Sequence, residues 1–452
     1  MGEFNGGTIT SDAGALLLRE INERRDFIKD FAKCFTDFRN PNKIEHSLHE
    51  LLAQRIFGLC LGYEDLIDHD ELRLDPLLAA VCGKMEPEGN DRKSIQDKGK
   101  ALAGKSTLNR LELACVLDEP DRYKKIFYSE EAIDDYFVDK FIESYSEAPV
   151  RIILDIDATD DPLHGQQQGR YFHGYYDCYC YLPLYIFCGD KLLSAKLNTA
   201  NLDPGNEALV DIARVIRRIR SYWPLVKILV RGDSGFCREE LMAFCESEEN
   251  VDYLFGISRN NRLLGRIKRE LKQAEKLFYK ERKPQRLFKD FCYRTKASWS
   301  RRRRVIGKAE YLAKGANPRF IVTSLPKDIF PGGELYKDTY CARGDMENRI
   351  KEQQLYLFAD RTSCGKMAPN RLRLYLSSVA YIIMNELRGK ALEGTDVQNA
   401  QCSTIRLKLL KIGALIKISV RRVHVSISSA YPYKDIFMRA LSRIQMAYPL
   451  RC

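Results

Sequence analysis

The stretch Arg151–Gly165, RIILDIDATDDPLHG, runs from an apolar strand into four carboxylates that lie within seven residues. Side chains alternate between the two faces of a strand, so Asp155 and Asp157 point to the same face. Two carboxylates held this close repel each other unless a positive charge lies between them. The stretch therefore predicts a strand whose end binds a divalent metal ion or carries out phosphoryl transfer.

The sequence that follows indicates a mixed α/β sheet. Residues 164–201 are rich in glycine and aromatic residues and predict two further antiparallel strands, which turn at Gly189-Asp190. A helix (EALVDIARVIRRIRSYW), a strand (VKILVRGDSGF), a second helix (REELMAFCE) and a last strand (VDYLFGIS) come next. This order, β-β-β-α-β-α-β, is that of an antiparallel hairpin extended by parallel strands.

Two more acidic positions stand where such a fold places its chemistry. Asp233 follows the apolar strand VKILVRG directly before a turn, although Asp-Ser-Gly is also common turn chemistry. The third position is in the segment YCARGDMENRIK, where residues spaced by three or four share one helical face. That face carries Tyr340, Arg343, Glu347 and Lys351. A salt-bridged surface stripe is the alternative interpretation of this segment.

Taken together, the acidic positions predict a metal site. Two strand-end aspartates and a helical glutamate can hold two Mg²⁺ or Mn²⁺ ions, because these cations prefer carboxylate oxygens. Such a pair of ions activates a water and stabilises the leaving oxygen of a phosphodiester. The predicted ligands are Asp157, Asp233 and Glu347, with Asp155 as the alternative first ligand. Arg343 and Lys351 would then meet phosphate oxygens.

The positive charge of the chain is concentrated in one segment. Residues 261–310 hold eighteen Lys or Arg and five Asp or Glu. Their charge balance, 18 − 5 = +13, is larger than the net charge of +11 of the whole chain. A block of this size predicts contact with a polyanion. Its sequence alternates as β-hairpins do, so we expect a basic β-rich insertion at 262–332. The block contains Trp299, which could stack on an unpaired base or belong to the core, and the run Arg301, Arg302, Arg303 and Arg304.

The length of 452 residues predicts several domains. Residues 1–145 show apolar spacing typical of helices, so we expect an all-helical N-terminal region before a core that begins at 146 and is interrupted at 261. The core would resume at 333 and end with a β-hairpin (ALIKISVRRVHVSIS) and a helix. No leader sequence or membrane-spanning apolar run is evident, which predicts a cytoplasmic protein.

At these motifs the chain resembles the DDE transposases of bacterial insertion sequences, specifically those of insertion-sequence family thirteen-eighty. The resemblance covers nearly the full length and includes SDAGALLLREI, IEHSLHELLAQRIFGLCLGYED, DHDELRLDPLLAA, LAGKSTLNRLE and the three acidic motifs. The related signature is Tyr, two residues, Arg, three residues, Glu, six residues and Lys. The first three members of this signature match in spacing, but position 354 is Gln and the nearest lysine is Lys351.

The resemblance implies an RNase H-like core in which Asp157, Asp233 and Glu347 hold two Mg²⁺ or Mn²⁺ ions. It implies cleavage at the ends of the element, followed by attack of the freed 3′-hydroxyl on target DNA. The implied partners are double-stranded DNA, as terminal inverted repeats and target, and a second copy of the chain. The N-terminal region and the basic insertion would grip the repeats, in a bacterial protein associated with the nucleoid.

Two other functions are compatible with some of these residues. DIDAT has the form of the DxDxT motif of haloacid-dehalogenase-type phosphatases, in which Asp155 would be the nucleophile and Asp157 its acid or base. Those enzymes follow the motif strand with a helix, whereas hairpin strands are expected here. A metal-dependent nuclease without strand transfer is the second alternative, because hydrolysis and transesterification use the same site.

Overall fold

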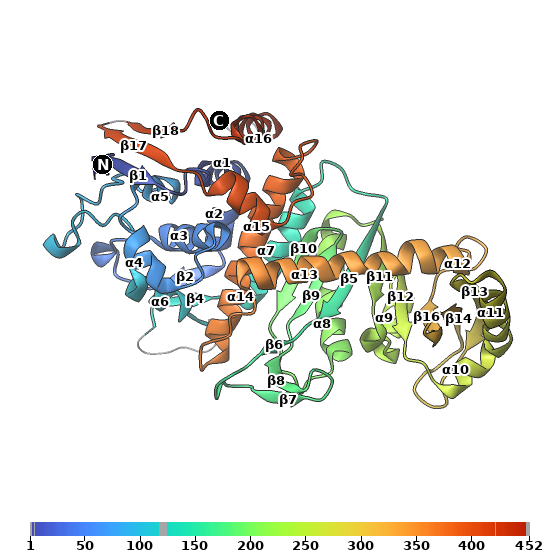
Figure 1. The fold of residues 1–452 in the computed structure, drawn as a ribbon. Helices are drawn as coiled ribbons and strands as arrows, with labels where there is room; N and C mark the ends of the chain where they lie inside the picture. The colour runs from blue at the N-terminus through green and yellow to red at the C-terminus, as the bar shows by residue number, and fades with distance from the viewer. Residues whose placement is uncertain (1, 4, 117–123, 421, 449–452) are drawn as a thin grey trace. The chain divides into compact units, whose positions relative to one another are not determined.

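The computed structural model describes residues 2–3, 5–116, 124–420 and 422–448 (Figure 1). The chain forms two compact units, each described here by itself. The terminal unit comprises Met1–Tyr136, Pro162–Gly169 and Lys351–Cys452, and the sheet unit comprises Phe137–Asp161 and Arg170–Ile350. Within the described residues, no helix has the length and apolar character needed to cross a membrane.

The terminal unit is mostly helical. Its helices are α1 (Ala15–Arg25), α2 (Phe27–Ala32), α3 (Leu48–Leu61), α4 (His69–Leu72), α5 (Pro76–Val81), α6 (Lys105–Glu112), α14 (Met367–Glu386), α15 (Cys402–Ile405) and α16 (Lys434–Ala447). Helix α3 begins with a capping box, in which the Ser47 hydroxyl accepts from the Glu50 N–H and the Glu50 carboxylate accepts from the Ser47 N–H. Helix α7 (Glu130–Glu143) runs from this unit into the sheet unit.

Two small sheets complete the terminal unit. One has the order β1 (Thr8–Thr10), β17 (Ala414–Ser419), β18 (Arg422–Ile427), and the other β2 (Phe35–Asp37), β4 (Ile126–Tyr128), β3 (Cys115–Val116). The predicted C-terminal hairpin and the helix after it are confirmed. The prediction that 1–145 is all helical is wrong, because β1 to β4 fall in it. These strands are only two or three residues long, too short for an alternating pattern to stand out.

The sheet unit is built on a nine-stranded mixed sheet. Its strand order is β10 (Lys191–Lys196), β9 (Leu184–Cys188), β5 (Arg151–Ala158), β11 (Lys227–Gly232), β12 (Val251–Ile257), β16 (Arg319–Thr323), β14 (Arg303–Leu312), β13 (Gln285–Tyr293), with β15 (Gly315–Ala316) beside β14. Strands β5, β11 and β12 are parallel, and the other neighbours are antiparallel.

The chain order from β5 to β12 confirms the expected β-β-β-α-β-α-β arrangement, with a short additional hairpin between β5 and β9. Its helices are α8 (Pro204–Tyr222) and α9 (Glu239–Ser247). Helix α8 begins at Pro204 because the Asp203 carboxylate accepts from the N–H of Gly205 at 2.8 Å and proline suits the first helical position. The antiparallel hairpin that follows β5 stands in place of the strand–helix crossover that the phosphatase interpretation requires.

The basic segment 262–332 differs from the expected insertion. It begins with two helices, α10 (Asn261–Arg266) and α11 (Lys268–Glu281), before any strand. Its strands β13, β14 and β16 also do not form a separate body. Strand β16 pairs antiparallel with β12, so the edge of the parallel sheet is extended by the basic segment. Core and insertion therefore share one hydrogen-bonded sheet (Figure 1).

The two faces of β5 have different surroundings. Ile152, Leu154 and Ile156 are buried in the main core with the apolar residues of α8 and α9. The opposite face carries Ile153, Asp155 and Asp157, because side chains alternate along a strand. On that face Ile153 packs with a smaller apolar cluster that contains Leu335 and Tyr336. The acidic end of β5 is thus on the face covered by the segment before α13 (Gly344–Leu357).

Candidate active site

Strands β5 and β11 bring two aspartates side by side. In their parallel register Asp155 is opposite Arg231 and Ile156 is opposite Gly232. Asp157 is the next residue of β5 and Asp233 directly follows the last residue of β11, so the two lie at the same level of the sheet. The Asp233 carboxylate also accepts the Gly235 N–H at 2.8 Å, which caps a single 3₁₀ turn. The carboxyl ends of the parallel strands therefore present both carboxylates together.

Arg343 joins this strand end to the helix that carries the third acidic residue. Its guanidinium donates to Asp157 Oδ2 at 2.9 Å and to Glu347 Oε1 at 2.8 Å. The chain reaches this point through one turn of π-helix (Leu335–Tyr340) and a 3₁₀ turn, and α13 then continues through Glu347. Asp157 is largely buried, whereas the Glu347 side chain is 47% exposed. Glu347 thus forms the open side of the cluster.

The electrostatics of Asp157 show that negative charge converges on it. Burial raises the pKa of Asp157 to about 6, with further upward contributions from Asp233 and Glu347 and opposition from Arg343. Burial by itself would lower the pKa of Arg343, but the charge of Asp157 and then that of Glu347 raise it. The cluster holds more negative charge than one guanidinium balances, so it has an affinity for a further cation.

The raised pKa of Asp157 has a consequence for stability. A carboxyl whose pKa is higher in the folded protein binds more protons there between pH 4 and 6, so its contribution to folding falls as pH rises through that window. We expect Asp157→Asn to be more stable than the original protein above pH 6, by about 1–3 kcal/mol. The difference should vanish towards pH 4. Urea unfolding from pH 4 to pH 8, with a chelator present, measures it.

Asp203→Asn provides a matched control for the pH trend. The pKa of Asp203 is lowered: burial would raise it, but the ion pair with Arg238 and the backbone N–H groups that it caps outweigh that effect. A lowered pKa adds stability above the unfolded value, so this variant should lose stability relative to the original protein as pH rises. Parallel trends for the two variants would contradict the assignment of excess negative charge to Asp157.

Tyr340 lies at the edge of the same cluster. Burial raises the pKa of its hydroxyl, with Arg343 opposing and Asp233 adding to the shift. Its ring packs against that of Tyr336, with centroids 5.5 Å apart. A Cβ at position 256 would lie 2.5 Å from the Tyr340 hydroxyl and 3.0 Å from the Ser234 nitrogen. The glycine in β12 therefore lets Tyr340 approach the backbone beside Asp233.

The alternative first ligand, Asp155, has a different environment. It is buried two residues before Asp157 in β5, on the same face of the strand. Arg231 binds it through two hydrogen bonds of 2.5 and 2.7 Å. Arg231 also donates to the carbonyl of Thr339, the residue before Tyr340. Both carboxylate oxygens of Asp155 are thus occupied by a bidentate ion pair. This geometry ties β5 to β11 and to the segment that leads into α13.

Lys351 is on α13 one turn after Glu347, and its side chain is exposed. Its contact with phosphate stays a prediction. Gln354, at the position where the related signature has lysine, belongs to the same helix and is half-buried.

The donor set suits a hard divalent cation. Carboxylate oxygens are the ligands that Mg²⁺ and Mn²⁺ prefer, and the Arg343 guanidinium already places a positive group between the carboxylates of Asp157 and Glu347. In the described part of the chain, no group of three His, Cys, Asp or Glu side chains is preassembled as a ligand cluster. Of the carboxylates that Arg343 binds, Glu347 is the more exposed one and Asp157 the more buried.

Several residues that were expected to contact DNA belong to the interior instead. Trp299 is 3% exposed and packs edge-on against Tyr293, with ring centroids 5.7 Å apart. Arg303 is buried between two carboxylates of α9, Glu239 and Glu246, at 2.6 and 2.8 Å. Arg304 is half-buried and bound to Asp290 at 2.6 Å. Because these side chains hold β14 and its loop in place, we assign them to internal packing.

Arg301 and Arg302 remain on the surface. Arg301 makes one ion pair, with Glu246 at 2.7 Å, and its side chain is 59% exposed. Arg302 is exposed and lines a basic pocket of about 730 Å³ together with Arg262 and Lys296. These two arginines are therefore accessible to a polyanion.

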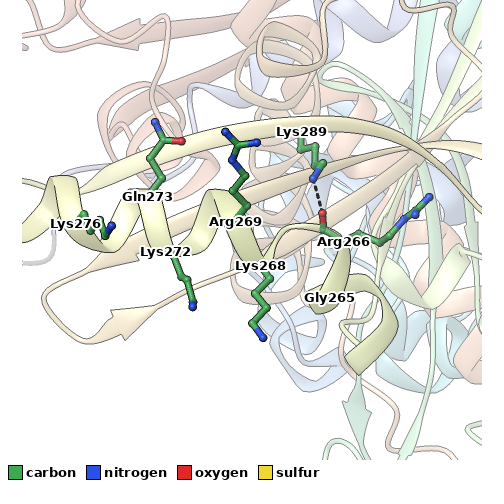
Figure 2. Close-up of a pocket in the computed structure, with 8 residues that line it drawn as sticks. All are labelled: Gly265, Arg266, Lys268, Arg269, Lys272, Gln273, Lys276 and Lys289. Atoms are coloured by element: carbon green, nitrogen blue, oxygen red, sulfur yellow. Dashed lines mark hydrogen bonds between the residues drawn. The ribbon is translucent and has the colours of Figure 1, made fainter.

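A second basic surface lies on α10 and α11, in the basic block but apart from the run of four arginines. It borders a shallow pocket of about 610 Å³. Figure 2 shows the basic side chains that line it, namely Arg266, Lys268, Arg269, Lys272, Lys276 and Lys289. Lys289 is bound to the Arg266 carbonyl at 2.7 Å and to Glu270. The four on α11, which we call the α11 cations (Lys268, Arg269, Lys272 and Lys276), are exposed and pair with no carboxylate of the described residues.

The ion pair of Arg231 with Asp155 and the helix α11 were not predicted, although the sequence carries a signal for each. Arg231 interrupts an apolar strand two residues before Asp233, which places a charge on the acidic face and implies a partner there. For α11, apolar residues recur at helical spacing from the residue before it, at Ile267, Leu271, Ala274 and Phe278.

Comparison with known protein families shows one family. The sequence matches the family model described as "Transposase DDE domain group 1" over residues 1–449. No protein of curated function matches the chain. Among solved structures the chain is similar to the one described as "Cryo-EM structure of piggyBac transposase synaptic complex with hairpin DNA". That similarity has a TM-score of 0.43 and 12% sequence identity, and it covers 89% of this chain and 80% of that chain.

Proposed function

Because this chain belongs to the family of transposase DDE domains of group 1, we propose that it cuts the ends of an insertion sequence and joins them to target DNA. The observation that carries this proposal is that Asp157 and Asp233 stand side by side at the carboxyl ends of parallel strands, and that Arg343 links Asp157 to Glu347. Family membership supports a transposase. We also propose that the chain belongs to insertion-sequence family thirteen-eighty and has an RNase H-like core.

The three carboxylates would hold two Mg²⁺ or Mn²⁺ ions. When bound, such ions would activate a water or the 3′-hydroxyl of the DNA as the nucleophile and stabilise the leaving oxygen of the phosphodiester. The chain contributes the fixed positions of the ligands: Asp157 and Asp233 are held by the backbone of adjacent strands, and Glu347 by α13. Burial at the strand ends also keeps water away from Asp157, which strengthens its attraction for a cation.

Arg343 and Tyr340 would orient the DNA strand. The guanidinium of Arg343 can donate in parallel to two oxygens of a phosphate, as it now donates to two carboxylates. Tyr340, held beside Asp233, has a hydroxyl that can donate to a second phosphate oxygen. Lys351, exposed on the next turn of α13, would contact the phosphate backbone further along the strand.

DNA carrying the element's own ends tests the function. In Mg²⁺ we expect nicks at the ends and, with a target plasmid, products joined through 3′-hydroxyl attack. Nicking without joining would favour a nuclease. Hydrolysis of a small phosphomonoester without any action on DNA would favour the phosphatase chemistry of Asp155. Because two ends must be joined together, we also propose that two copies of the chain act in one DNA complex.

The α11 cations would bind the phosphate backbone of the terminal repeats, together with Arg301 and Arg302. Unpaired cations on one exposed helix can each replace a counterion of DNA. Such contacts give affinity without sequence preference. Recognition of the repeat sequence would come from other residues, among which we include the N-terminal helical region.

We expect neutralisation of the four α11 cations to glutamine to weaken binding to any DNA duplex. Each lost phosphate contact removes about 0.9 from the slope of log affinity against log salt, so the slope should become shallower by about 2–4. Fluorescence anisotropy over a salt series measures this. The matched control neutralises Arg286 and Lys308, which are already balanced by Glu310 at 2.5 and 2.6 Å. An equal change in slope for the control would contradict the role of α11.

A further inference from the structure

A short hairpin next to the active site exposes an unusual number of aromatic rings. It consists of β7 (Tyr171–His173) and β8 (Cys178–Tyr181), which pair antiparallel with Phe172 opposite Tyr179. Its side chains Phe172 and Tyr179 are 52% and 43% exposed, and Tyr175 in the turn is 85% exposed. Aromatic surface of this size that is left to solvent on a folded chain commonly marks a binding site.

One face of the hairpin combines these rings with a cation. Arg170 directly precedes β7, and both Arg170 and Phe172 contact the ring of Tyr179 in β8. The Arg170 guanidinium is 3.7 Å from the centroid of the Tyr179 ring, and the Phe172 ring meets Tyr179 edge-on at 5.5 Å. We call these three residues the aromatic face. It offers planar groups that stack and a positive charge within the same small area.

The hairpin is attached directly to the acidic strand. The Tyr176 hydroxyl donates to the carbonyl of Ala158 at 3.3 Å, and Ala158 follows Asp157 in β5. Burial raises the pKa of Tyr176, and the charges of Asp160 and then Asp157 raise it further. The side chain of Tyr176, in the turn of the hairpin, therefore joins the hairpin to the end of β5. A DNA strand whose phosphate lies at the carboxylates would therefore lie close to this hairpin.

We propose that the aromatic face stacks on unpaired bases of the DNA strand beside the phosphate that is cut. This inference rests on the proposed function. Every base has a π-face, so stacking on Phe172 and Tyr179 would be tolerant of sequence. Arg170 adds attraction for the anionic strand and a second stacking plane. Bases that have left the duplex near the cut would be held there, which keeps the strand open at the carboxylates.

The test compares a blunt DNA duplex with the same duplex carrying a short single-stranded extension at its 3′ or 5′ end. We expect the full-length protein to bind one extended duplex about tenfold more tightly than the blunt one, the gain given by stacking of about one base. The pair Phe172→Ala and Tyr179→Ala should remove this preference and leave blunt-duplex affinity unchanged. A fluorescent purine analogue in the extension should be quenched by the original protein only.

Two controls separate stacking from loss of structure. Phe172→Tyr with Tyr179→Phe keeps both rings and should keep the preference. Tyr222→Ala removes a ring on α8 that is 50% exposed and also lies near an arginine, Arg218, at 5.6 Å; it should keep the preference as well.

Other outcomes would overturn the inference in distinguishable ways. Binding and metal-dependent cutting of blunt ends without any gain from an extension would leave the proposed function intact and reject the aromatic face as its base-stacking site. A change in sedimentation of the alanine pair with an unchanged preference would show that the face contacts a second copy of the chain. Failure to bind any DNA would reject both the inference and the function.

Discussion

Asp157→Ala is expected to reduce Mg²⁺-dependent nicking of the element's ends by on the order of 10³-fold or more, because the proposed metal ligand at the reacting centre is lost. Binding of the same DNA should change by less than about twofold, since the basic surfaces that meet phosphates are untouched. Gel assays of nicking and anisotropy of labelled ends measure the two quantities. We expect Mg²⁺ to raise the melting temperature of the original protein, and the same variant should lose this rise.

An exposed carboxylate provides the control for this expectation. Asp177, in the turn of the aromatic hairpin, is exposed, and its change to asparagine should leave nicking and metal-dependent stabilisation in place. Asparagine also tolerates the left-handed backbone that Asp177 adopts, with a φ of 54°. If Asp157→Ala retained nicking while Asp233→Ala lost it, the first ligand would have to be sought elsewhere.

Asp155→Ala is expected to destabilise the fold rather than to act on chemistry alone. It would leave the Arg231 guanidinium buried without its charge partner, a change that costs about 3–5 kcal/mol in other proteins. Arg231→Ala should cost a similar amount, because Asp155 would then be the uncompensated charge. Urea unfolding of each variant measures the loss, and partial unfolding would lower activity indirectly.

A double replacement separates a structural pair from a catalytic residue. Asp155→Leu together with Arg231→Met removes both charges and fills the space with apolar groups, so it should be more stable than either alanine variant. We expect it to recover much of the fold. Its residual activity would then report the value of the bond from Arg231 to the Thr339 carbonyl, which positions the segment before Tyr340. Single-variant losses below about 1 kcal/mol would contradict a buried, compensated pair.

The arrangement around the carboxylates was largely predictable from local pattern. An apolar run that ends in Asp157 and another that ends in Asp233 indicate strands whose carboxyl ends meet at one edge. The spacing of Arg343 and Glu347 indicates one helix face, and the two side chains are bound to each other there. These features depend on residues that are close in the sequence, so the periodicity of a strand or a helix is enough to reveal them.

Partners that are distant in the sequence were not predictable in the same way. Arg231 meets Asp155 only because β5 and β11 are in a particular register. Arg303 is neutralised by Glu239 and Glu246, more than fifty residues away, so a run of four arginines did not show which of its members are accessible. Likewise, nothing local indicated that the basic segment would pair with β12 instead of folding on its own.

The pairing of β16 with β12 places the proposed DNA-binding helix and the carboxylates on one hydrogen-bonded sheet. If the DNA-binding helix belonged to a domain on a flexible linker, its distance from the carboxylates could vary. Here that distance is set by the width of a few strands, about 5 Å each. The sheet would thus fix the distance between α11 and Asp157. Once the phosphates of a DNA end lie on α11, this distance would determine which phosphate reaches Asp157. Uniform ends, cut at one phosphate, would follow from the sheet itself.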